Sequence, residues 1–582
     1  MTVPLDSWKQ IARYLKRDER TVRRWESEGL PVHRHLHKKQ ATVYAYKSEI
    51  DVWWSNGRSQ LELAEPAATP KRRRFMWLLA AGFALAVVGL GLNVGGLRDQ
   101  LLGRPAPGEI GSIAVLPLKN LSADREQDYF AEGMTESLIT QLGKISTLHV
   151  ISHQSVLRYR DGTKSLPQIA RELNVNALVE GTVLRVGDKI RITTNLVQAA
   201  PERHLWAESF ESDQRDILGL QGQVAREVAS HIRVKLTPQE HGRLTVSRPV
   251  DPEAYEAYLL GRAYADKART PTNSMRAKEY FEKAIEKDPG YAPAYASLAR
   301  LYSFTGGNWF VTRDGAGYRD AHLRARELAD KAVKLDDTLA DAHHALAWAK
   351  QVEWDWAGAQ RDYLRAIELN PSDAVTRISY AMFLYGMQRF GEAVAQARRA
   401  QQLDPAAVSI NTFAGAAYFY AGRDEEATAS LRKVMELEPG YPNASIVIAR
   451  TYVTKGMYEQ AIAELENALT LHPRQPHLIG ALAHVYARTG KREKALALVD
   501  ALKQLSAERA GPATFSLVWA YAGLGDKDKA FAWLERCYEE RTPRLAWLNV
   551  DPLLDPLRSD PRFPDLVRRV GLPARVAAVR GQ

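Results

Sequence analysis

Apolar and polar residues follow three different patterns along the chain, and each pattern predicts a different kind of structure. In residues 6–30 apolar side chains recur three or four positions apart, as on two short amphipathic helices. Residues 75–97 are 23 consecutive uncharged residues. Strand-like and helical spacings follow each other over residues 110–240, and helical spacing alone continues over residues 251–542. The pattern predicts a multidomain chain.

The first pattern predicts a small head over residues 1–57. Its first helix would bury Ile11 and its second Val22 and Trp25, with a turn between them that is short enough for a helix-turn-helix. Asp18 can cap the second helix. After Gly29 the sequence LPVHRHLHKKQATVYAYK predicts a β-hairpin wing, and SEIDVWW predicts a third helix. We therefore expect a winged helix-turn-helix.

The second helix of this head would keep several cationic side chains on its open side. Guanidinium groups near a helix N-terminus can pair with guanine edges or with phosphates in the major groove. The pattern IAxYLxxxxRTVxRWExEGLPVHR resembles the head of the MerR and excisionase-like group. The resemblance implies that the head binds double-stranded DNA, through Arg20, Thr21, Arg23 and Arg24 on the second helix and Arg34, Lys38, Lys39 and Tyr44 on the wing. Lys16, in the turn between the two helices, is a further candidate DNA contact.

Charge supports an anionic partner for the head and leaves two alternatives open. Residues 1–74 hold sixteen Lys or Arg and nine Asp or Glu, so they carry +7 of the net charge of +10. A basic helical domain could instead contact anionic lipid. The alternating His33, His35 and His37 could bind a metal, but phosphate contacts are the preferred interpretation because a fourth ligand is missing from the pattern.

The uncharged run predicts a membrane anchor. Residues 75–97 would form a helix about 34 Å long, enough to cross a hydrocarbon core of about 30 Å. The basic linker, residues 58–74, ends in Lys71, Arg72, Arg73 and Arg74, and the positive-inside rule places that side in the cytoplasm. We therefore expect a single-pass protein of the bacterial inner membrane, with a cytoplasmic N-terminus and a periplasmic C-terminal region.

Residues 110–240 predict an α/β domain. Two strands and two helices precede a hairpin that turns at Gly187 and Asp188. The phrases SIAVLPLKNLSAD, FAEGMTESLITQL and ALVEGTVLRVGDKIRITTNLV resemble the TolB N-terminal-like domain, which is related to FlgO-type proteins. That resemblance implies a fold without an agreed catalytic residue. We expect His149 and His153 on one strand, and the spacing places no carboxylate beside them.

Residues 251–542 repeat themselves with a period of 34 residues. Two sets of small residues and one set of prolines recur at that step: Ala347, Ala381, Gly415, Ala449 and Ala483; Ala359, Ala393, Ala427, Ala461 and Ala495; Pro371, Pro405, Pro439 and Pro473. Small residues let two helices approach closely, and proline ends the second helix. This is the tetratricopeptide pattern, which predicts an all-α solenoid that is followed by a C-terminal cap, residues 543–582.

The first helix of each repeat should line a concave face. In proteins with the resembling repeats that face binds peptides or protein segments, so a protein or peptide partner is expected here. The candidate partner-binding residues are His344, Trp348, Met382, Tyr385, Phe419, Arg450 and His484.

These modules together favour a transcriptional regulator and not an enzyme. The arrangement is similar to that of ToxR and CadC-type membrane-integrated regulators. The single cysteine, Cys537, excludes paired-cysteine sites, and the chain lacks the GxxxxGK, HExxH and GxSxG motifs. We expect no catalytic residue, cofactor or metal, and a homodimer on two half-sites is a hypothesis. The alternative function is a membrane-anchored tetratricopeptide scaffold for envelope proteins.

Overall fold

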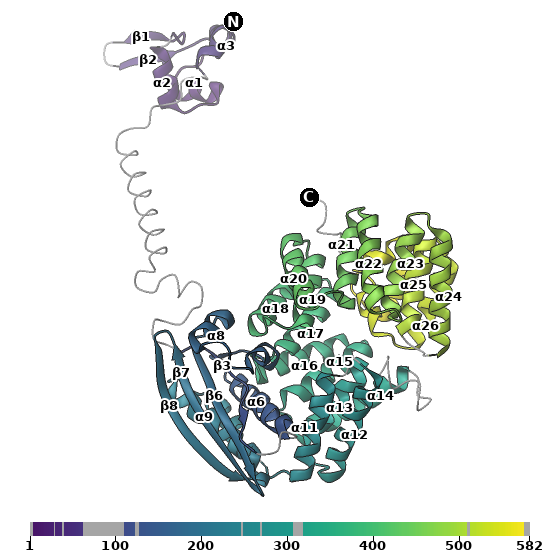
Figure 1. The fold of residues 1–582 in the computed structure, drawn as a ribbon. Helices are drawn as coiled ribbons and strands as arrows, with labels where there is room; N and C mark the ends of the chain where they lie inside the picture. Colours follow the sequence, from purple (N-terminus) through teal and green to yellow (C-terminus); the bar gives the residue numbers. More distant parts are fainter. Residues whose placement is uncertain are drawn as a thin grey trace. The chain divides into compact units, whose positions relative to one another are not determined.

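The computed structural model describes residues 4–27, 29–37, 40–61, 110–122, 127–245, 248–267, 270–305, 318–508 and 512–574. They belong to two compact units, which divide after Gly103 (Figure 1). Each unit is described by itself below.

The described residues of the first unit form three helices and a β-hairpin: α1 (Trp8–Leu15), α2 (Glu19–Glu26), β1 (His33–His37), β2 (Gln40–Tyr44) and α3 (Lys47–Leu61). Its core consists of Ile11, Ala12, Val22, Trp25, Leu30, Ala45 and Ile50, all buried. Trp25 packs against Trp53 and Trp54 of α3, with ring centroids 6.0 and 5.4 Å apart. The apolar positions that the sequence pattern selected are thus the ones that hold the three helices together.

The second unit begins with a mixed sheet. Its strands are β3 (Ser112–Val115), β4 (Lys119–Asn120), β5 (His149–Val150), β6 (Ala177–Val186), β7 (Lys189–Ala199) and β8 (Glu202–Asp213). They are ordered β5-β3-β6-β7-β8, and β4 pairs with β6. The β3–β5 and β3–β6 pairs are parallel, whereas β6–β7 and β7–β8 are antiparallel.

Helices cover both faces of this sheet. One face packs against α6 (Asp128–Gly143) and α9 (Ile217–His231), and the other against α7 (His153–Val156) and α8 (Leu166–Leu173). The 3₁₀ turns Leu157–Tyr159 and Gln214–Asp216 and the helix α10 (Pro238–Thr245) complete this α/β region. Figure 1 shows the long strands β6, β7 and β8 side by side.

Two details of the α/β region differ from the sequence prediction. His153 lies on α7 and not on the strand with His149, because β5 ends after Val150. The third long strand, β8, was not predicted, since Phe210 is the one buried side chain in its alternation. The predicted hairpin turn at Gly187 is present, with Val186 opposite Lys189.

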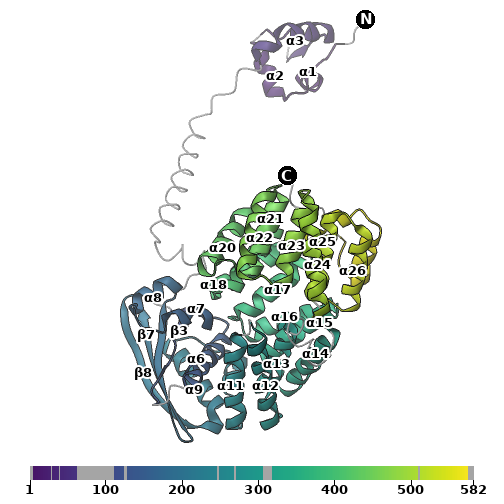
Figure 2. The same cartoon turned by 45° about the vertical axis from the view of Figure 1, so that its right-hand side comes forward.

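The rest of the second unit is a solenoid of paired helices. In the described residues the pairs are α11 (Pro252–Asp266) with α12 (Pro271–Lys287), α13 (Ala292–Thr305) with α14 (Tyr318–Leu335), α15 (Ala340–Val352) with α16 (Trp356–Leu369), α17 (Ala374–Gly386) with α18 (Phe390–Leu403), α19 (Val408–Tyr420) with α20 (Asp424–Leu437), α21 (Pro442–Thr454) with α22 (Tyr458–Leu471), α23 (Pro476–Arg488) with α24 (Arg492–Glu508), and α25 (Pro512–Leu524) with α26 (Lys527–Glu539). Figure 2 follows these pairs from α11 to α26.

The 34-residue pattern explains how each pair packs. The recurring alanines of both helices are buried, because the two helices of a repeat meet there. At Gly415 a Cβ atom would lie 2.9 Å from Leu431 Cγ, so the helices leave no room for a larger residue. Each recurring proline lies two residues beyond the end of a second helix, as at Pro371 after Leu369.

The C-terminal cap packs along the first helices of distant repeats. It consists of the 3₁₀ segments η5 (Pro543–Trp547) and η6 (Pro552–Leu557) and of α27 (Arg562–Val570). The η5 segment contacts α15 and α17, and η6 contacts α21 and α25. Trp547 Nε1 donates to the carbonyl oxygen of Met382 at 3.0 Å, and Trp356 Nε1 donates to that of Val570 at 3.1 Å. The cap therefore lies within the concave side of the solenoid.

The predicted membrane anchor requires a correction. Over the residues that the structure describes, no helix has both the length and the apolar character that a membrane crossing needs. The segment on which the prediction was based, residues 75–97, lies outside those residues, as do most of the basic linker and the end of the predicted cap. We therefore withdraw the transmembrane helix from the fold class, together with the single-pass inner-membrane location. The α/β region and the helical solenoid remain.

Candidate functional site

The α2 helix of the first unit exposes the cationic residues that were expected to read DNA. Arg20, Arg23 and Arg24 are exposed, whereas Val22 and Trp25 of the same helix are buried. Arg23 forms an ion pair with Glu19 at 3.6 Å. Because the core residues face inward, the arginines share the open side of the helix, where an anion of extended shape can approach them.

Thr21 has a structural role at the start of this helix. The Asp18 side chain accepts from Thr21 N and from Thr21 Oγ1, at 2.9 and 2.7 Å. These hydrogen bonds from Thr21 hold the pKa of Asp18 below its usual value. Lys16 lies in the turn before them with a left-handed backbone, φ 52°, and its side chain is exposed. The N-terminus of α2 is thus fixed, and its first arginine, Arg20, lies two residues after the Asp18 cap.

The hairpin after α2 carries the remaining predicted DNA contacts. Arg34 on β1 is exposed and forms an ion pair with Glu26 of α2 at 2.7 Å. Tyr44 on β2 stacks on His33, with ring centroids 5.3 Å apart. His33 Nε2 lies 2.7 Å from a Glu49 carboxylate oxygen, so this ring is engaged within the unit. Lys38 and Lys39 lie outside the described residues.

The concave side of the solenoid brings together four of the seven predicted partner-binding residues. Trp348, Met382, Tyr385 and Arg450 line one cavity of about 270 Å³. The other three are buried elsewhere: His344 Nε2 bonds Ser379 Oγ at 3.0 Å, His484 Nδ1 bonds the Trp519 carbonyl oxygen at 3.0 Å, and Phe419 lies in the core.

The opposite wall of this cavity comes from the cap and was not predicted. Arg544, Trp547 and Asp551 line it, and Asp551 accepts from Arg450 Nη2 at 2.9 Å. These residues follow the last repeat, so the 34-residue period contains no signal for them. They become part of the site because the cap folds back against the first helices.

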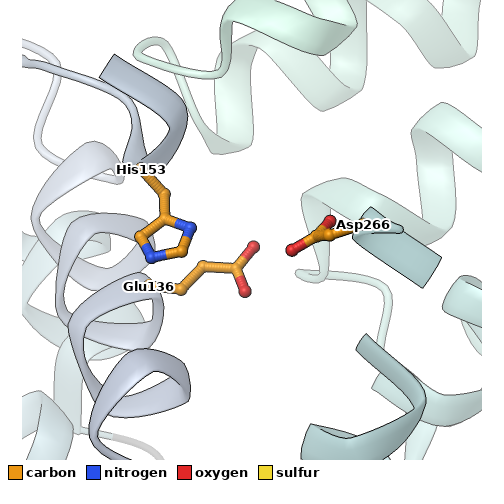
Figure 3. Close-up of side chains that lie close together, drawn as sticks. All are labelled: Glu136, His153 and Asp266. Carbon is orange, nitrogen blue, oxygen red and sulfur yellow. The ribbon is translucent and has the colours of Figure 1, made fainter. Parts of the chain in front are cut away.

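A polar cluster joins the α/β region to the first helix pair. The cluster consists of Glu136 on α6, His153 on α7 and Asp266 on α11. Each contributes one imidazole nitrogen or carboxylate oxygen, and these three atoms lie within 4.8 Å of one another. Figure 3 shows the imidazole and the two carboxyl groups facing one another. Arg262 forms an ion pair with Glu136, which balances its charge. Burial, followed by the Glu136 charge, raises the pKa of Asp266. We interpret this cluster as a junction between the two regions.

Comparison with protein families identifies two parts of the second unit. Models described as tetratricopeptide repeat match residues 280–309 and 453–510. The prediction of tetratricopeptide repeats is confirmed. Residues 109–227 match a model described as HilA/YgeH-like transcriptional regulator, second domain. The α/β region therefore resembles a domain that occurs in transcriptional regulators.

One curated relative changes a prediction. The chain is 37% identical over 238 residues to a protein of Rhizobium meliloti (strain 1021) named Putative adenylate cyclase 3. The match covers 41% of this chain and 40% of the relative, so the chain spans well under half of that protein's length. The sequence analysis excluded enzymatic activity. Because this relative bears an enzyme's name, that exclusion is wrong, and we withdraw it.

Three solved structures with low sequence identity are similar to parts of this chain. They are YrrB, a tetratricopeptide protein with an unusual peptide-binding site (22% identity, 33% of this chain and 89% of that chain, TM-score 0.22), PilF of Pseudomonas aeruginosa (21%, 38% and 92%, TM-score 0.29) and yeast Tom70 (17%, 55% and 68%, TM-score 0.36). No shared function follows from likenesses of this degree.

Proposed function

We propose that this chain is a transcriptional regulator that binds double-stranded DNA through its first unit and a protein or peptide through its repeats. The observation that carries the proposal is the exposed arginine side of α2 on a unit with its own core. Two further observations support it: the HilA/YgeH-like match of residues 109–227 and the tetratricopeptide repeats, which are typical of protein interaction.

In this proposal α2 enters the major groove and the hairpin lies on the backbone, as in MerR-like winged heads. Arg20 and Arg24 contact base edges or phosphates, and Arg23 exchanges Glu19 for a phosphate oxygen. Arg34 can do the same with its Glu26 partner, since both side chains are partly exposed. Lys16, Lys38, Lys39 and Tyr44 remain proposed phosphate contacts.

DNA binding is tested with the full chain and labelled duplexes in fluorescence anisotropy over a salt series. We expect tight binding at low salt and a marked loss in the variant with Arg20→Ala and Arg24→Ala. The slope of log affinity against log salt should decrease by about 0.9 for each of the two arginines that contacts a phosphate, and by about 1.8 if both do. The control removes the same charge from the second unit, by Arg171→Ala and Arg203→Ala, where both arginines are exposed.

Two results would reject this part of the proposal. One is a wild-type chain that ignores duplex DNA at low salt, which would leave an interaction scaffold built on the repeats. The other is an equal loss in the α2 variant and the control, which would mean that net charge alone attracts DNA. The stoichiometry on a duplex with two half-sites tests the homodimer hypothesis in the same experiment.

A second candidate function follows from the relative's name alone. If this chain shares the activity that the name Putative adenylate cyclase 3 denotes, it should form cyclic AMP from ATP in the presence of a divalent cation. The assay uses the purified full chain with Mg²⁺ or Mn²⁺ and mass-spectrometric detection of the product. Formation of no product above a boiled control would leave the regulatory proposal as the only one.

A further inference from the structure

The cavity between the repeats and the cap has the size of a small-molecule site. Its volume is about 270 Å³, close to the lower end of the range of about 300–1,000 Å³ that is usual for such sites. First helices of several repeats form one wall, and residues 542–551 form the other. The cap occupies the neighbouring part of the concave side, so its residues and the first helices line the remaining space together.

Two guanidinium groups and one carboxylate line this cavity. Arg450 donates from Nη2 to Asp551 Oδ2 at 2.9 Å, and Trp519 Nε1 donates to the same oxygen at 2.9 Å. The Arg450 side chain is 9% exposed, and its Nε is buried with no hydrogen-bond partner in the described part of the chain. Nη1 donates to Tyr420 Oη at 3.3 Å, and the two Nη atoms carry further N–H groups that can donate to an acceptor in the cavity that Arg450 lines.

The second guanidinium comes from the cap. Arg544 Nε donates to His477 Nε2 at 3.3 Å. Arg450 and Arg544 both lie over the Trp519 ring, with Cζ atoms 5.1 and 5.0 Å from its centroid. The indole thus holds two positive charges close together, a distribution that attracts an anion.

The pKa of His477 is consistent with this positive potential. Burial, together with the charges of Arg544 and Arg450, holds the pKa of His477 well below its usual value. The ring is therefore neutral near pH 7 and can accept the hydrogen bond from Arg544. It leaves the excess positive charge of the lining unchanged.

Aromatic rings form much of the remaining wall. Tyr385 and Tyr420 lie 4.9 Å apart, and Trp547 packs against Tyr385 at 6.0 Å. All three line the cavity. From this geometry we propose that the cavity binds a small aromatic carboxylate, whose carboxylate meets Arg450 and Arg544 and whose ring packs against these aromatic side chains. The two guanidinium groups and the Asp551 carboxylate leave one excess positive charge in the lining, which the carboxylate of the ligand would balance.

The proposal is tested on the full chain with phenylacetate as the charged probe and phenylacetamide as its neutral counterpart. Calorimetry measures both affinities. We expect saturable binding of phenylacetate and about tenfold or greater weakening for phenylacetamide, because a charge-assisted hydrogen bond is replaced by a neutral one. This comparison uses the wild-type protein and needs no variant.

A matched pair of variants locates the site. Arg544→Gln should weaken phenylacetate binding about tenfold or more. The control is Arg541→Gln, because Arg541 also lies over an indole, with its Cζ 3.7 Å from the Trp354 ring centroid, and it does not line the cavity. The control should bind phenylacetate as the wild type does. Thermal unfolding of both variants shows whether the cap remains folded.

Several results would overturn the proposal. They are the absence of saturable phenylacetate binding at millimolar concentration, equal affinity for phenylacetamide, and unchanged binding in a folded Arg544→Gln variant. A peptide ending in phenylalanine that binds when phenylacetate does not would place the carboxylate on a protein partner instead. None of these results depends on DNA binding by the first unit, so the two proposals fail separately.

Discussion

The substitution Asp551→Asn should release the cap from the repeats. The Asp551 side chain is 5% exposed and accepts hydrogen bonds from Arg450 Nη2 and Trp519 Nε1, each at 2.9 Å, and from Leu553 N at 3.1 Å. Asparagine has nearly the same shape but leaves the buried Arg450 charge without its counter-charge. Loss of one partner of a buried ion pair costs about 3–5 kcal/mol, which is much more than an exposed pair contributes.

Hydrogen exchange of the cap amides is the suitable measurement, because the chain has several regions that need not unfold together. A cost of about 3–5 kcal/mol corresponds to a fall in protection of about a hundredfold to a few thousandfold in η6 and α27. The control is Asp555→Asn, since Asp555 pairs with Arg558 but is 54% exposed, so its loss should cost at most about 1 kcal/mol.

The double variant Arg450→Met with Asp551→Asn completes the experiment. Removing both charges leaves no uncompensated ion, so we expect it to recover much of the protection that Asp551→Asn loses. The reasoning would be refuted if Asp551→Asn and Asp555→Asn reduced protection equally, or if the double variant were no better protected than Asp551→Asn alone.

Three further predictions concern the packing of the second unit. In Gly386→Ala the new Cβ would lie 2.7 Å from the Ala546 carbonyl oxygen, so we expect about 1–3 kcal/mol lower stability in urea unfolding, whereas Gly391→Ala, with open space around it, should be neutral or stabilising. Ser155→Ala removes the hydrogen bond that Ser155 Oγ donates to Asp404 Oδ1 and the one that it accepts from Ala406 N. It should cost about 1–3 kcal/mol of stability, measured as faster amide hydrogen exchange in α7. Unchanged exchange would argue against this contact as a support of the α/β region. Burial lowers the pKa of His484 from 6.5 to about 4, so the unfolded state binds more protons than the folded state between those pH values. The free energy of unfolding should therefore fall by about 3 kcal/mol as the pH is lowered through that window. In His484→Gln the dependence on pH should be weaker, and an equal dependence would contradict this assignment.

The periodic parts of the chain were predictable, because periodicity reports directly which side of an element is buried. The positions of Val22 and Trp25 on α2 follow from helical spacing, and the recurring alanines from Ala347 onward mark where paired helices meet. The strand β8 was missed because it lies at the sheet edge and buries only Phe210, so its apolar alternation is absent.

The candidate cavity was only half predictable. Trp348 and Tyr385 could be assigned to it because the repeat pattern identifies first-helix positions. Arg544 and Asp551 could not, since their positions depend on how a non-repeating segment folds back, and the sequence spacing of about 100 residues between Arg450 and Asp551 carries no period. His484 does not line this cavity, because its ring is buried and bonds the Trp519 carbonyl oxygen of the next repeat.

The return of the cap changes how the solenoid should unfold. In a simple repeat array each repeat contacts only its neighbours, so the ends can unzip one after another. Here Trp547 bonds Met382 and Trp356 bonds Val570, across 165 and 214 residues of sequence. These contacts tie a terminal segment to repeats in the middle of the array. Removal of the cap, residues 543–582, should therefore loosen helices from α15 onward, so that the repeats unfold one after another.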